Sequence, residues 1–386
     1  MSARIVESIA EIPALEWNAL VASASPDPED INPFLSHAFL LALQESGCAG
    51  PQTGWETRFL TLTRDGRLAG VLPLYGKTHS WGEFVFDWAW ADAYQRHGLA
   101  YYPKWISAVP FTPVTGPRLL AATPELRAEL LDAALELARQ AGVSSLHLLF
   151  PDETQAREME ARGMMLRRGV QFHWRNPGYA DFADYLASLR RDKRKKIQQE
   201  RRKVQDAGIR FRRLAGADIG EADWRHFMAC YIRTHRQFNS PPAFNLDFFR
   251  CIGAAMPDKL LLIIAERDGK PIAAAFNLRN RRALFGRSWG TLEYHPGLHF
   301  ETCYYQAIEF CIERRIATFE GGAQGEHKLA RGFLPSTTWS AHWLAHPEFS
   351  RAVEDFLKRE GAGMDQYVDE LNEHDPFKRV AAVAEP

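Results

Sequence analysis

The alternation of apolar and polar residues predicts two β-hairpins at distant points of the chain. One covers residues 59–75, FLTLTRDGRLAGVLPLY, and the other covers residues 261–279, LLIIAERDGKPIAAAFNLR. In both, an Arg-Asp-Gly turn separates two apolar runs, which is a strong hairpin signal. The repetition indicates an internal duplication that makes two domains, with chance similarity as the alternative. Aromatic pairs with one common spacing follow the hairpins, at Phe86 and Trp90 and at Phe285 and Trp289.

A helix and a strand are predicted after each hairpin. In the first half, Thr123 is an N-cap and Pro124 the first helical residue, and leucine and alanine recur at helical spacing until Gly142 ends the helix. The strand SSLHLLF follows. In the second half, CYYQAIEFCIERR is the predicted helix and IATFE the strand.

The turn cluster Asn176-Pro177-Gly178 marks the expected domain boundary. We therefore expect an N-terminal domain over residues 1–178 and a C-terminal domain over residues 179–386. A chain of 386 residues suits two such domains. One long helix, Asp181 to Ala207, would open the second domain, and an amphipathic helix is predicted from Glu348 to Leu371.

The predicted helix 181–207 is unusually basic. Nine of the fourteen residues 190–203 are Lys or Arg, and the apolar seam is thin. Such a helix either lies in solvent between the domains or contacts phosphates of RNA, a nucleotide or a lipid carrier. No aromatic residue interleaves the cations, which argues against base stacking there. The candidate nucleic-acid-binding residues are Lys193, Arg194, Lys195 and Lys196.

Overall composition points away from several classes of protein. The 47 basic and 48 acidic residues balance, so no global field indicates nucleic acid. Five cysteines without a CxxC pair indicate a reducing compartment and neither a disulfide framework nor a thiolate zinc site. The N-terminal residues lack a signal-peptide pattern and no apolar run is long enough to span a membrane, so we expect a cytoplasmic protein.

Residues 77–105 concentrate aromatic and ionisable side chains. Aromatic walls with a few polar groups are typical of a ligand pocket, and an aromatic core with charged edges is the alternative. Phe84, Phe86 and Trp88 alternate like a half-buried strand, and we assign them to the core. The candidate substrate-binding residues of this half are His79, Glu83, Trp90, Asp92, Tyr102, Lys104 and Arg118.

A second candidate site follows the strand IATFE. Glycines 321, 322 and 325 precede Glu326, His327, Lys328 and Arg331. Small residues allow a ligand to approach the backbone closely, and a carboxylate, an imidazole and two cations suit an anionic substrate that exchanges protons. A charged loop after a buried strand is the alternative interpretation.

These segments together resemble a known family, the FemAB-like (peptidoglycan biosynthesis/recognition) branch of the GNAT acyltransferase superfamily. The resemblance covers nearly the whole chain, and the basic segment RRDKRKKIQQERRKVQDAG shares it. The most specific segments are HSWGEFVFDWAWADAY, YYPKW with FTPVTGPR, LHFETCYYQAIEF and GAQGEHKLARGFLP.

The resemblance implies an α/β fold of tandem GNAT-like domains, with mixed sheets flanked by helices. It implies transfer of an aminoacyl group from aminoacyl-tRNA to an amine of a nucleotide- or lipid-linked cell-wall precursor, by direct attack without a covalent enzyme intermediate. Glu326 or His327 would be the base or proton relay, and Lys328 and Arg331 would stabilise an oxyanion or bind a carboxylate. Tyr304 or its neighbour Tyr305 would protonate the leaving group, and Arg287 could reach the same space.

Two departures from the family patterns affect the chemistry. After the strand LFGRSWG the chain lacks the glycine-rich loop that binds the pyrophosphate of acyl-CoA, and Glu293 and Glu301 would repel phosphate. No cofactor is therefore expected to be required, and acyl-CoA is a doubtful donor. Fem enzymes often have Phe-Lys-x-Gly-Phe near the C-terminal strands, where this chain has Ala330 at the lysine position.

Two other functions stay open beside the Fem-like one. One is an N-acyltransferase that uses acyl-CoA through a remodelled phosphate loop. The other is a protein without catalysis that binds a cell-wall precursor or glycan. A metal site is not expected, because Pro296-Gly297 interrupts the histidine spacing of HPGLHFE, and no nucleophile elbow, P-loop or dinucleotide fingerprint occurs.

Overall fold

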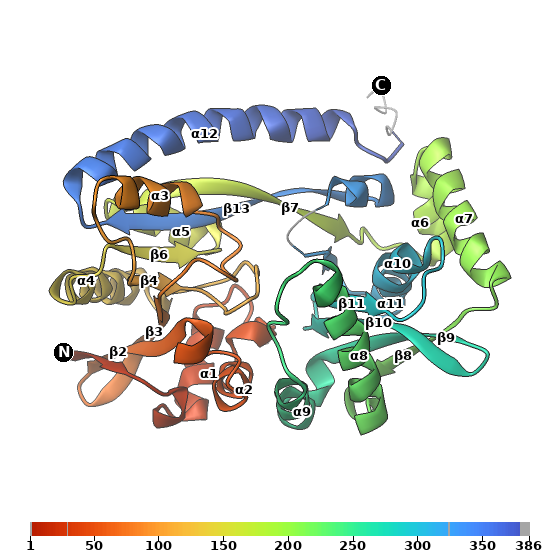
Figure 1. The fold of residues 1–386 in the computed structure, drawn as a ribbon, viewed down its shortest axis with the longest axis horizontal. Coiled ribbons are helices and arrows are strands. Elements are labelled where there is room, and N and C mark those ends of the chain that lie inside the picture. Colours follow the sequence, from red (N-terminus) through yellow and green to blue (C-terminus); the bar gives the residue numbers. More distant parts are fainter. Residues whose placement is uncertain (1, 29, 323–324, 379–386) are drawn as a thin grey trace, which may run out of the picture. The chain divides into compact units, whose positions relative to one another are not determined.

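The computed structural model describes residues 2–28, 30–322 and 325–378 and divides into two compact units (Figure 1). Unit 1 comprises residues 1–170, 243–257 and 337–366, and unit 2 comprises the remaining residues. The first crossing lies between Val170 and Gln171, eight residues before the boundary expected at residue 178. Two later segments return to unit 1, which the sequence pattern did not indicate.

Unit 1 is a mixed sheet with helices packed on it, in the strand order β1-β2-β3-β4-β6-β13, with β5 beside β3. Helix α4 packs on β2, β3 and β6, and their apolar side chains form one core around Leu72, Leu130 and Leu148. The elements are β1 (Ser2–Val6), α1 (Ala14–Ser23), α2 (His37–Glu45), β2 (Trp55–Arg64), β3 (Arg67–Lys77), α3 (Trp88–Arg96), β4 (Lys104–Ser107), β5 (Leu120–Ala121), α4 (Pro124–Gln140), β6 (Ser145–Leu149), α5 (Glu153–Ala161) and α9 (Leu246–Ala255), with most of α12 (Pro347–Glu373).

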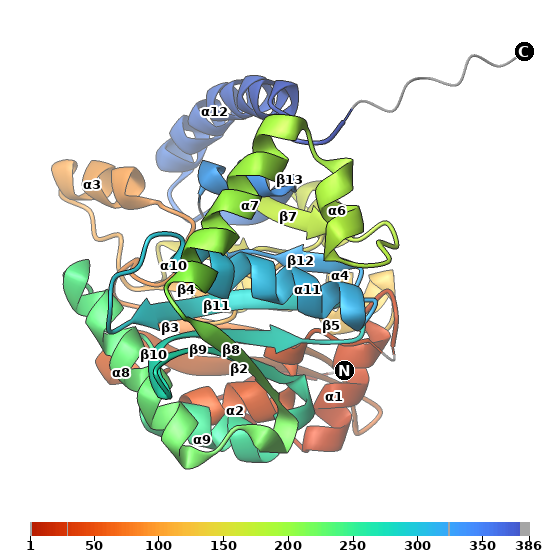
Figure 2. The same cartoon turned by 90° about the vertical axis from the view of Figure 1, so that its right-hand side faces the viewer.

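In unit 2 the strands of the mixed sheet follow the order β7-β12-β11-β10-β9-β8. Helix α8 packs on β10 and β11, while α7 packs on α10 and the π-helical turn after it (Figure 2). The elements are α6 (Phe182–Ser188), α7 (Arg191–Asp206), β8 (Arg210–Ala215), α8 (Glu221–Gln237), β9 (Leu260–Arg267), β10 (Lys270–Arg279), β11 (Ala283–Thr291), α10 (Leu298–Phe300), the π-helical turn (Glu301–Tyr305), α11 (Gln306–Glu313), β12 (Thr318–Glu320) and a 3-10 helix (Glu326–Arg331).

Both predicted hairpins are present, as β2–β3 and β9–β10. Their turns have the same backbone geometry, with φ of 51° at Asp65 and 52° at Asp268, followed by φ of 75° at Gly66 and 72° at Gly269. Positive φ at both central residues is the type I′ pattern that matches strand twist. The hairpins are therefore equivalent in structure as well as in sequence.

Two strands begin in one unit and end in the other. Strand β7 (Met165–Arg175) ends in unit 2, where it pairs with β12. Strand β13 (Phe333–Leu344) ends in unit 1, where it pairs with β6. This exchange explains why a single boundary in the sequence does not separate the units.

Several predicted helices agree with the structure, and one is interrupted. Helix α4 begins at Pro124 with Thr123 as its side-chain N-cap, and α12 covers the predicted C-terminal helix. The basic helix is two helices, α6 and α7, because Leu189 has an extended backbone and forms a β-bridge with Phe377. Fully buried Leu189 thus ends α6 by a tertiary contact.

The prediction that Phe84, Phe86 and Trp88 form a core strand is wrong. Phe84 has a φ of 60°, Trp88 begins α3, and the three side chains are 40%, 53% and 41% exposed. The polar residues of this segment take the buried positions instead. The aromatic-spacing match is also wrong, because Phe285 and Trp289 lie on one strand, whereas Phe86 precedes α3 and Trp90 lies in it.

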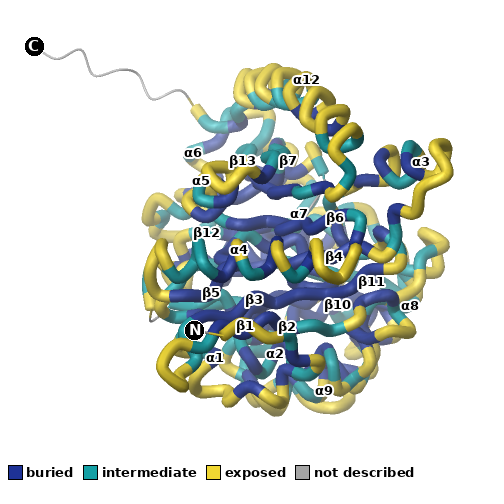
Figure 3. The backbone as a smooth tube through the Cα atoms, turned by 90° about the vertical axis from the view of Figure 1, so that its left-hand side faces the viewer, coloured by how far each residue is buried: buried dark blue, intermediate teal, exposed yellow. Residues whose placement is uncertain are grey.

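The buried residues lie mainly along the strands, and the outer turns of α3 and α12 are exposed (Figure 3). Across the described residues, no helix is both long and apolar enough to cross a membrane.

Candidate functional site

A cavity lies in unit 2 beside the end of strand β12. Strand β11 pairs with β12 from Ala283 to Phe285, where β12 ends at Glu320. Beyond this point a cavity of about 120 Å³ lies along β11. Its lining comes from β10, β11 and the helix after them, including Asn277, Arg287, Ser288, Trp289, His299, Cys303 and Tyr304. A half-open cavity with these polar groups can hold a small acyl group.

Gly321 forms part of the cavity wall and adds no side chain to it. A Cβ on Gly321 would lie 3.0 Å from the ring of Phe333 and within 3.3 Å of the Lys328 side chain. A larger residue at Gly321 would therefore displace the lysine chain behind it. The approach of a ligand to the glycine run stays a prediction.

An ion pair lies beside the cavity at the end of β12. Glu320 is 8% exposed, and its Oε2 lies 3.6 Å from Nη2 of Arg287. Burial raises the pKa of Glu320 to about 7, although the Arg287 charge opposes the shift, and burial lowers the pKa of Arg287 to about 10. A carboxyl group that titrates near neutral pH can accept a proton from an amine.

Lys328 adds a second buried cation near Glu320. It is 2% exposed, and its Nζ donates to the carbonyl of Gly322 at 3.0 Å. Burial, followed by the Arg287 charge, lowers its pKa to about 8. Burial, followed by the charges of Arg175, Arg287 and Lys328, lowers the pKa of His173 on β7 to about 3, which keeps that imidazole neutral. Two buried cations thus lie at this side of the cavity, and one of them, Arg287, pairs with Glu320.

Tyr304 lines the cavity from the π-helical turn. Its hydroxyl lies 3.2 Å from Nε2 of His327, and burial raises its pKa above the ordinary value. Burial, then Lys328, lowers the pKa of His327. Tyr304 is therefore protonated at neutral pH and can donate a proton. Inserted π turns are frequent at functional sites.

Two predicted residues of this half have other roles. Glu326 is exposed, does not line the cavity, and accepts a hydrogen bond from Tyr367 at 2.7 Å. Arg331 is 2% exposed and pairs with Glu200 of α7 at 2.8 Å. Its remaining donors reach the Tyr305 hydroxyl and the carbonyl of His327. Arg331 therefore anchors the 3-10 helix to α7, and the expectation that it binds substrate is not supported.

Helix α7 also closes the start of α10. Gly297 caps α10 with a φ of 88°, and a Cβ there would lie 3.0 Å from the carbonyl oxygen of Glu200. Leu298 packs in one apolar cluster with Val204. Helix α7 therefore covers the start of α10, where a phosphate group would otherwise find free backbone N–H groups.

The cations of α7 divide between two sides of the helix. Arg201 pairs with Glu301 and Glu309, and Ile197 and Val204 are buried. Lys193 and Arg194 are half-buried, with Lys193 3.1 Å from Asp192, whereas Lys195 and Lys196 are exposed. The outer face thus keeps cations that a polyanion can reach.

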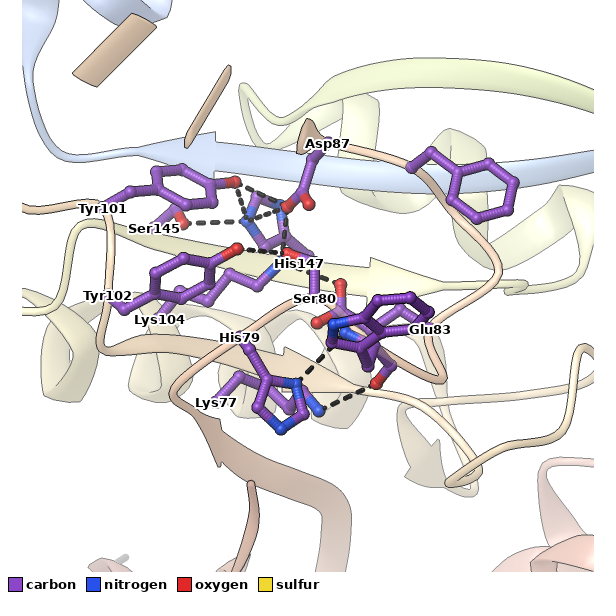
Figure 4. A network of polar contacts seen from close by, with 12 residues as sticks. Lys77, His79, Ser80, Glu83, Asp87, Tyr101, Tyr102, Lys104, Ser145 and His147 are labelled. Atoms are coloured by element: carbon purple, nitrogen blue, oxygen red, sulfur yellow. Dashed lines mark hydrogen bonds and ion pairs between the residues drawn. The ribbon is translucent and has the colours of Figure 1, made fainter. Parts of the chain in front are cut away.

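A buried charge cluster occupies unit 1 (Figure 4). Lys104, at the start of β4, donates to Glu83 at 2.7 Å, to Ser80 at 2.9 Å and to Asp87. Burial would lower the pKa of Lys104, but the two carboxylates raise it. Burial raises the pKa of Glu83 to about 7, while Lys104 and His147 outweigh burial and hold the pKa of Asp87 at about 2.

Lys77 and a chain of hydrogen bonds extend this cluster. Lys77 lies 3.8 Å from the centre of the Trp55 ring, and burial lowers its pKa to about 7. On the other side, Tyr101 donates to Asp87 at 2.7 Å, and His147 contacts Tyr101 at 3.2 Å and His342 at 2.7 Å. Burial lowers the pKa of both histidines, so the chain is neutral apart from Asp87.

The cluster brings together some of the predicted residues of the first half. Glu83 and Lys104 are in direct contact, and Tyr102 reaches them through Ser80 at 2.8 Å. His79 lies at the edge and accepts a hydrogen bond from the Trp81 backbone, while Trp90 packs edge-on against His342. Figure 4 shows the labelled side chains directed toward one another from β3, β4, β6 and the segment before α3.

Asp92 and Arg118 lie outside the cluster. Asp92 is exposed and pairs with Arg96 one turn along α3. Arg118 is fully buried and donates to four backbone carbonyls, including Leu149 at 2.7 Å and Val114 at 2.6 Å. It holds the chain after β4 in place, so the expectation that it binds substrate is not supported.

Sequence reasoning missed Glu320, Lys77 and His147. Glu320 ends the strand IATFE directly before the glycines, and a carboxylate at the end of a buried strand was a usable signal. Lys77 ends an apolar strand, and His147 lies within one. A single ionisable residue in such a strand has no distinguishing sequence pattern. Among the described residues, no group of three or more His, Cys, Asp or Glu side chains could hold a metal ion.

Comparison with known proteins gives a family and a fold. A protein-family model described as FemAB-like, peptidoglycan biosynthesis/recognition, matches residues 8–379. No curated protein sequence matches the chain. The structure of FemX superposes with a TM-score of 0.56 at 12% identity, covering 92% of this chain and 100% of FemX.

Two further solved structures share the fold. The C-terminal domain of a proposed lysylphosphatidylglycerol synthetase from Agrobacterium fabrum has a TM-score of 0.56 at 10% identity, with 90% of this chain and 96% of that chain covered. L-PGS from Bacillus licheniformis has a TM-score of 0.52 at 9% identity, with 85% and 98% covered. The α/β fold is thus the tandem GNAT-like fold that the sequence motifs predicted.

Proposed function

The chain belongs to the FemAB-like family, and on that premise we propose that it transfers an aminoacyl or acyl group to an amine in the cavity of unit 2. One observation carries the proposal. The cavity between β11 and β12 lies beside a carboxyl group with a pKa of about 7 and is lined by a protonated tyrosine, Glu320 and Tyr304 respectively. Amine acylation needs a proton acceptor and a proton donor in this arrangement.

Each chemical step has a residue suited to it. Glu320 removes a proton from the acceptor ammonium, and the neutral amine attacks the carbonyl carbon of the donor ester. Negative charge develops on the carbonyl oxygen, where Lys328 and Arg287 supply positive charge. The carbon–oxygen ester bond then breaks, and Tyr304 gives its proton to the departing hydroxyl oxygen. The second proton of the attacking nitrogen returns to Tyr304, so that the product is a neutral amide. No covalent enzyme intermediate is needed.

The donor in this proposal is aminoacyl-tRNA, and the acceptor is a cell-wall precursor. Two observations support the donor. Lys195 and Lys196 are exposed on α7 and suit a phosphate backbone, and α7 covers the helix start that would hold the pyrophosphate of acyl-CoA. The family description supports the acceptor, and such precursors are made in the cytoplasm, where we place the protein.

A transfer assay tests the proposal directly. The purified protein is incubated with aminoacyl-tRNAs or acyl-CoAs and with UDP-linked muropeptides, and the product is identified by mass. We expect an aminoacylated muropeptide from the tRNA donor. Product from acyl-CoA alone would refute the tRNA donor, and no product from any donor would refute the transferase assignment.

Two matched substitutions test the proposed base. Glu320→Gln removes the proton acceptor, and we expect turnover to fall by about 10²–10⁴-fold. Glu326→Gln changes the exposed carboxylate of the same loop region and should leave turnover within about twofold of the native protein. The opposite ranking of the two variants would assign the base to Glu326.

A further inference from the structure

In the segment that precedes and begins α3, polar side chains are buried and aromatic side chains are exposed. Ser80, Glu83 and Asp87 are buried, at 3–4% exposure, and contact Lys104. The aromatic side chains between and beside them point to solvent. Their exposed fractions are 64% for Trp81, 40% for Phe84, 53% for Phe86 and 41% for Trp88. Single exposed aromatic residues are normal on a protein surface. Four within eight residues form an exposed apolar patch, which indicates an interaction surface.

The inverted arrangement is held by specific contacts. Lys104 forms ion pairs with both carboxylates, and Figure 4 shows these side chains together. Gly82 has a φ of 81°, and a Cβ there would lie 2.5 Å from the Phe111 ring. Phe84 has a φ of 60°, which is uncommon for an aromatic residue. The exposure of the rings is therefore built into the fold.

The backbone of this segment is also satisfied from inside. Nζ of Lys77 donates to the carbonyl of Trp81 at 3.2 Å. Nη1 of Arg167 donates to the carbonyl of Phe86 at 2.6 Å. Two carbonyls of exposed aromatic residues thus have charged donors on the protein side. Such pairing lowers the free-energy cost of transferring these backbone carbonyls from water to an apolar environment.

We propose that residues 80–88 dock into the interfacial region of a lipid bilayer. Tryptophan and phenylalanine favour this region, because the rings leave water while the indole N–H stays at the headgroup level. Within residues 80–88, which the structure describes in full, the only charged side chains are Glu83 and Asp87, and both are buried against Lys104. The outer surface is thus uncharged and complements an uncharged apolar layer.

The same observations disfavour two other ligands. A polyanion needs exposed cations on the segment, and residues 80–88 contain no Lys or Arg. A glycan needs polar side chains next to the rings to bind its hydroxyl groups, and the polar side chains here are buried on Lys104.

Vesicle binding tests the proposal. The full-length protein is sedimented with phosphatidylcholine vesicles in about 1 M KCl, which shortens the Debye length to about 3 Å and suppresses binding through α7. We expect measurable partition of the native protein. The variant with Trp81, Phe84, Phe86 and Trp88 all changed to Ser should partition at least about tenfold less. Phe238→Ser, at a residue of unit 2 that is 76% exposed, should partition like the native protein.

A second variant keeps the test independent of folding. Trp81→Phe with Trp88→Phe retains four aromatic rings and should partition within about twofold of the native protein. Bromine labels on the lipid chains should quench tryptophan fluorescence in the native protein, and this double variant should lose most of that quenching. Absence of partition, equal partition of the serine variant, or unchanged quenching in the double variant would each overturn the proposal.

Discussion

The two units both bury charged side chains, and they do so in opposite ways. In unit 1, Lys104 contacts Glu83 and Asp87, and Lys77 lies beside them, so that two lysines accompany two carboxyl groups. In unit 2, Arg287 pairs with a single carboxyl group, Glu320, whose pKa is raised to about 7, and Lys328 is a second buried cation beside the cavity. The second set lies beside the cavity of about 120 Å³. Charges that balance one another serve the fold, whereas unbalanced charges next to a cavity suit a ligand.

The connection after the hairpin shows where the two halves differ. In unit 2, β10 ends at Arg279 and β11 begins at Ala283. In unit 1, β3 ends at Lys77 and β4 begins only at Lys104, with the aromatic segment and α3 between them. The charge cluster binds this insertion to the sheet. Its two carboxylates belong to the insertion, while both lysines belong to the strands that flank it.

The largest expected effect is on the stability of unit 1. Lys104→Met would leave two buried carboxylates without their cation, and we expect a loss of about 3–5 kcal/mol in the free energy of unfolding. Urea unfolding measures it. Lys196→Met on the exposed face of α7 is the control and should change stability by less than about 0.5 kcal/mol. A loss under about 1 kcal/mol for Lys104→Met would contradict the anchoring role.

The next effect concerns proton donation in unit 2. Tyr304→Phe removes the hydroxyl that lines the cavity, and we expect turnover to fall by about 10–100-fold. The neighbouring Tyr305 bonds to Glu200 and Arg331 instead. Tyr305→Phe should therefore lower the melting temperature more than the turnover. Equal kinetic losses in the two variants would argue against a proton-donating role for Tyr304.

The pH dependence of transfer sharpens the comparison further. Glu320 must be ionised to accept a proton, so activity should rise as the pH increases through about 7. Lys328 must be protonated to stabilise an oxyanion, so activity should fall as the pH increases beyond about 8. In a rate profile, Lys328→Met should remove the upper limb and keep the lower one. A lower limb that survives in Glu320→Gln would exclude that residue as its origin.

The smallest expected effect is on tRNA binding by α7. Lys195→Gln with Lys196→Gln removes two exposed cations, and we expect the slope of log affinity against log salt to fall by roughly 1.4. Lys193→Gln should have a smaller effect, because Lys193 already pairs with Asp192. Filter binding at several salt concentrations measures both. An unchanged slope in the double variant would place the tRNA contact elsewhere.

Local patterns of the sequence predicted the elements that local physics stabilises. The Asp-Gly hairpins, the capped helix α4, the helix α12 and the buried seam of Ile197 and Val204 on α7 follow from turn chemistry, capping and apolar periodicity. The spacing of Phe86 and Trp90 was misleading. Residues four apart share a face in a helix and in a strand, so spacing alone did not distinguish the two.

The candidate site was predicted only in part. Tyr304 and Lys328 were named from the sequence and lie at or beside the cavity, as does Arg287. Arg331 and Arg118 were named for their charge, and their donors are bound within the protein. A buried arginine and a ligand-binding arginine are identical in sequence, because the partners that distinguish them come from distant segments.

The sequence by itself determined the duplicated hairpins, the main helices and the family. Only the tertiary structure decided which strands exchange between the units, which carboxylate lies beside the cavity, and which face of residues 80–88 points outward. The physical reason is the range of the forces involved. Turns, caps and periodicity act over a few residues, whereas Lys104 with Glu83 and Arg287 with Glu320 are contacts between segments that only folding brings together.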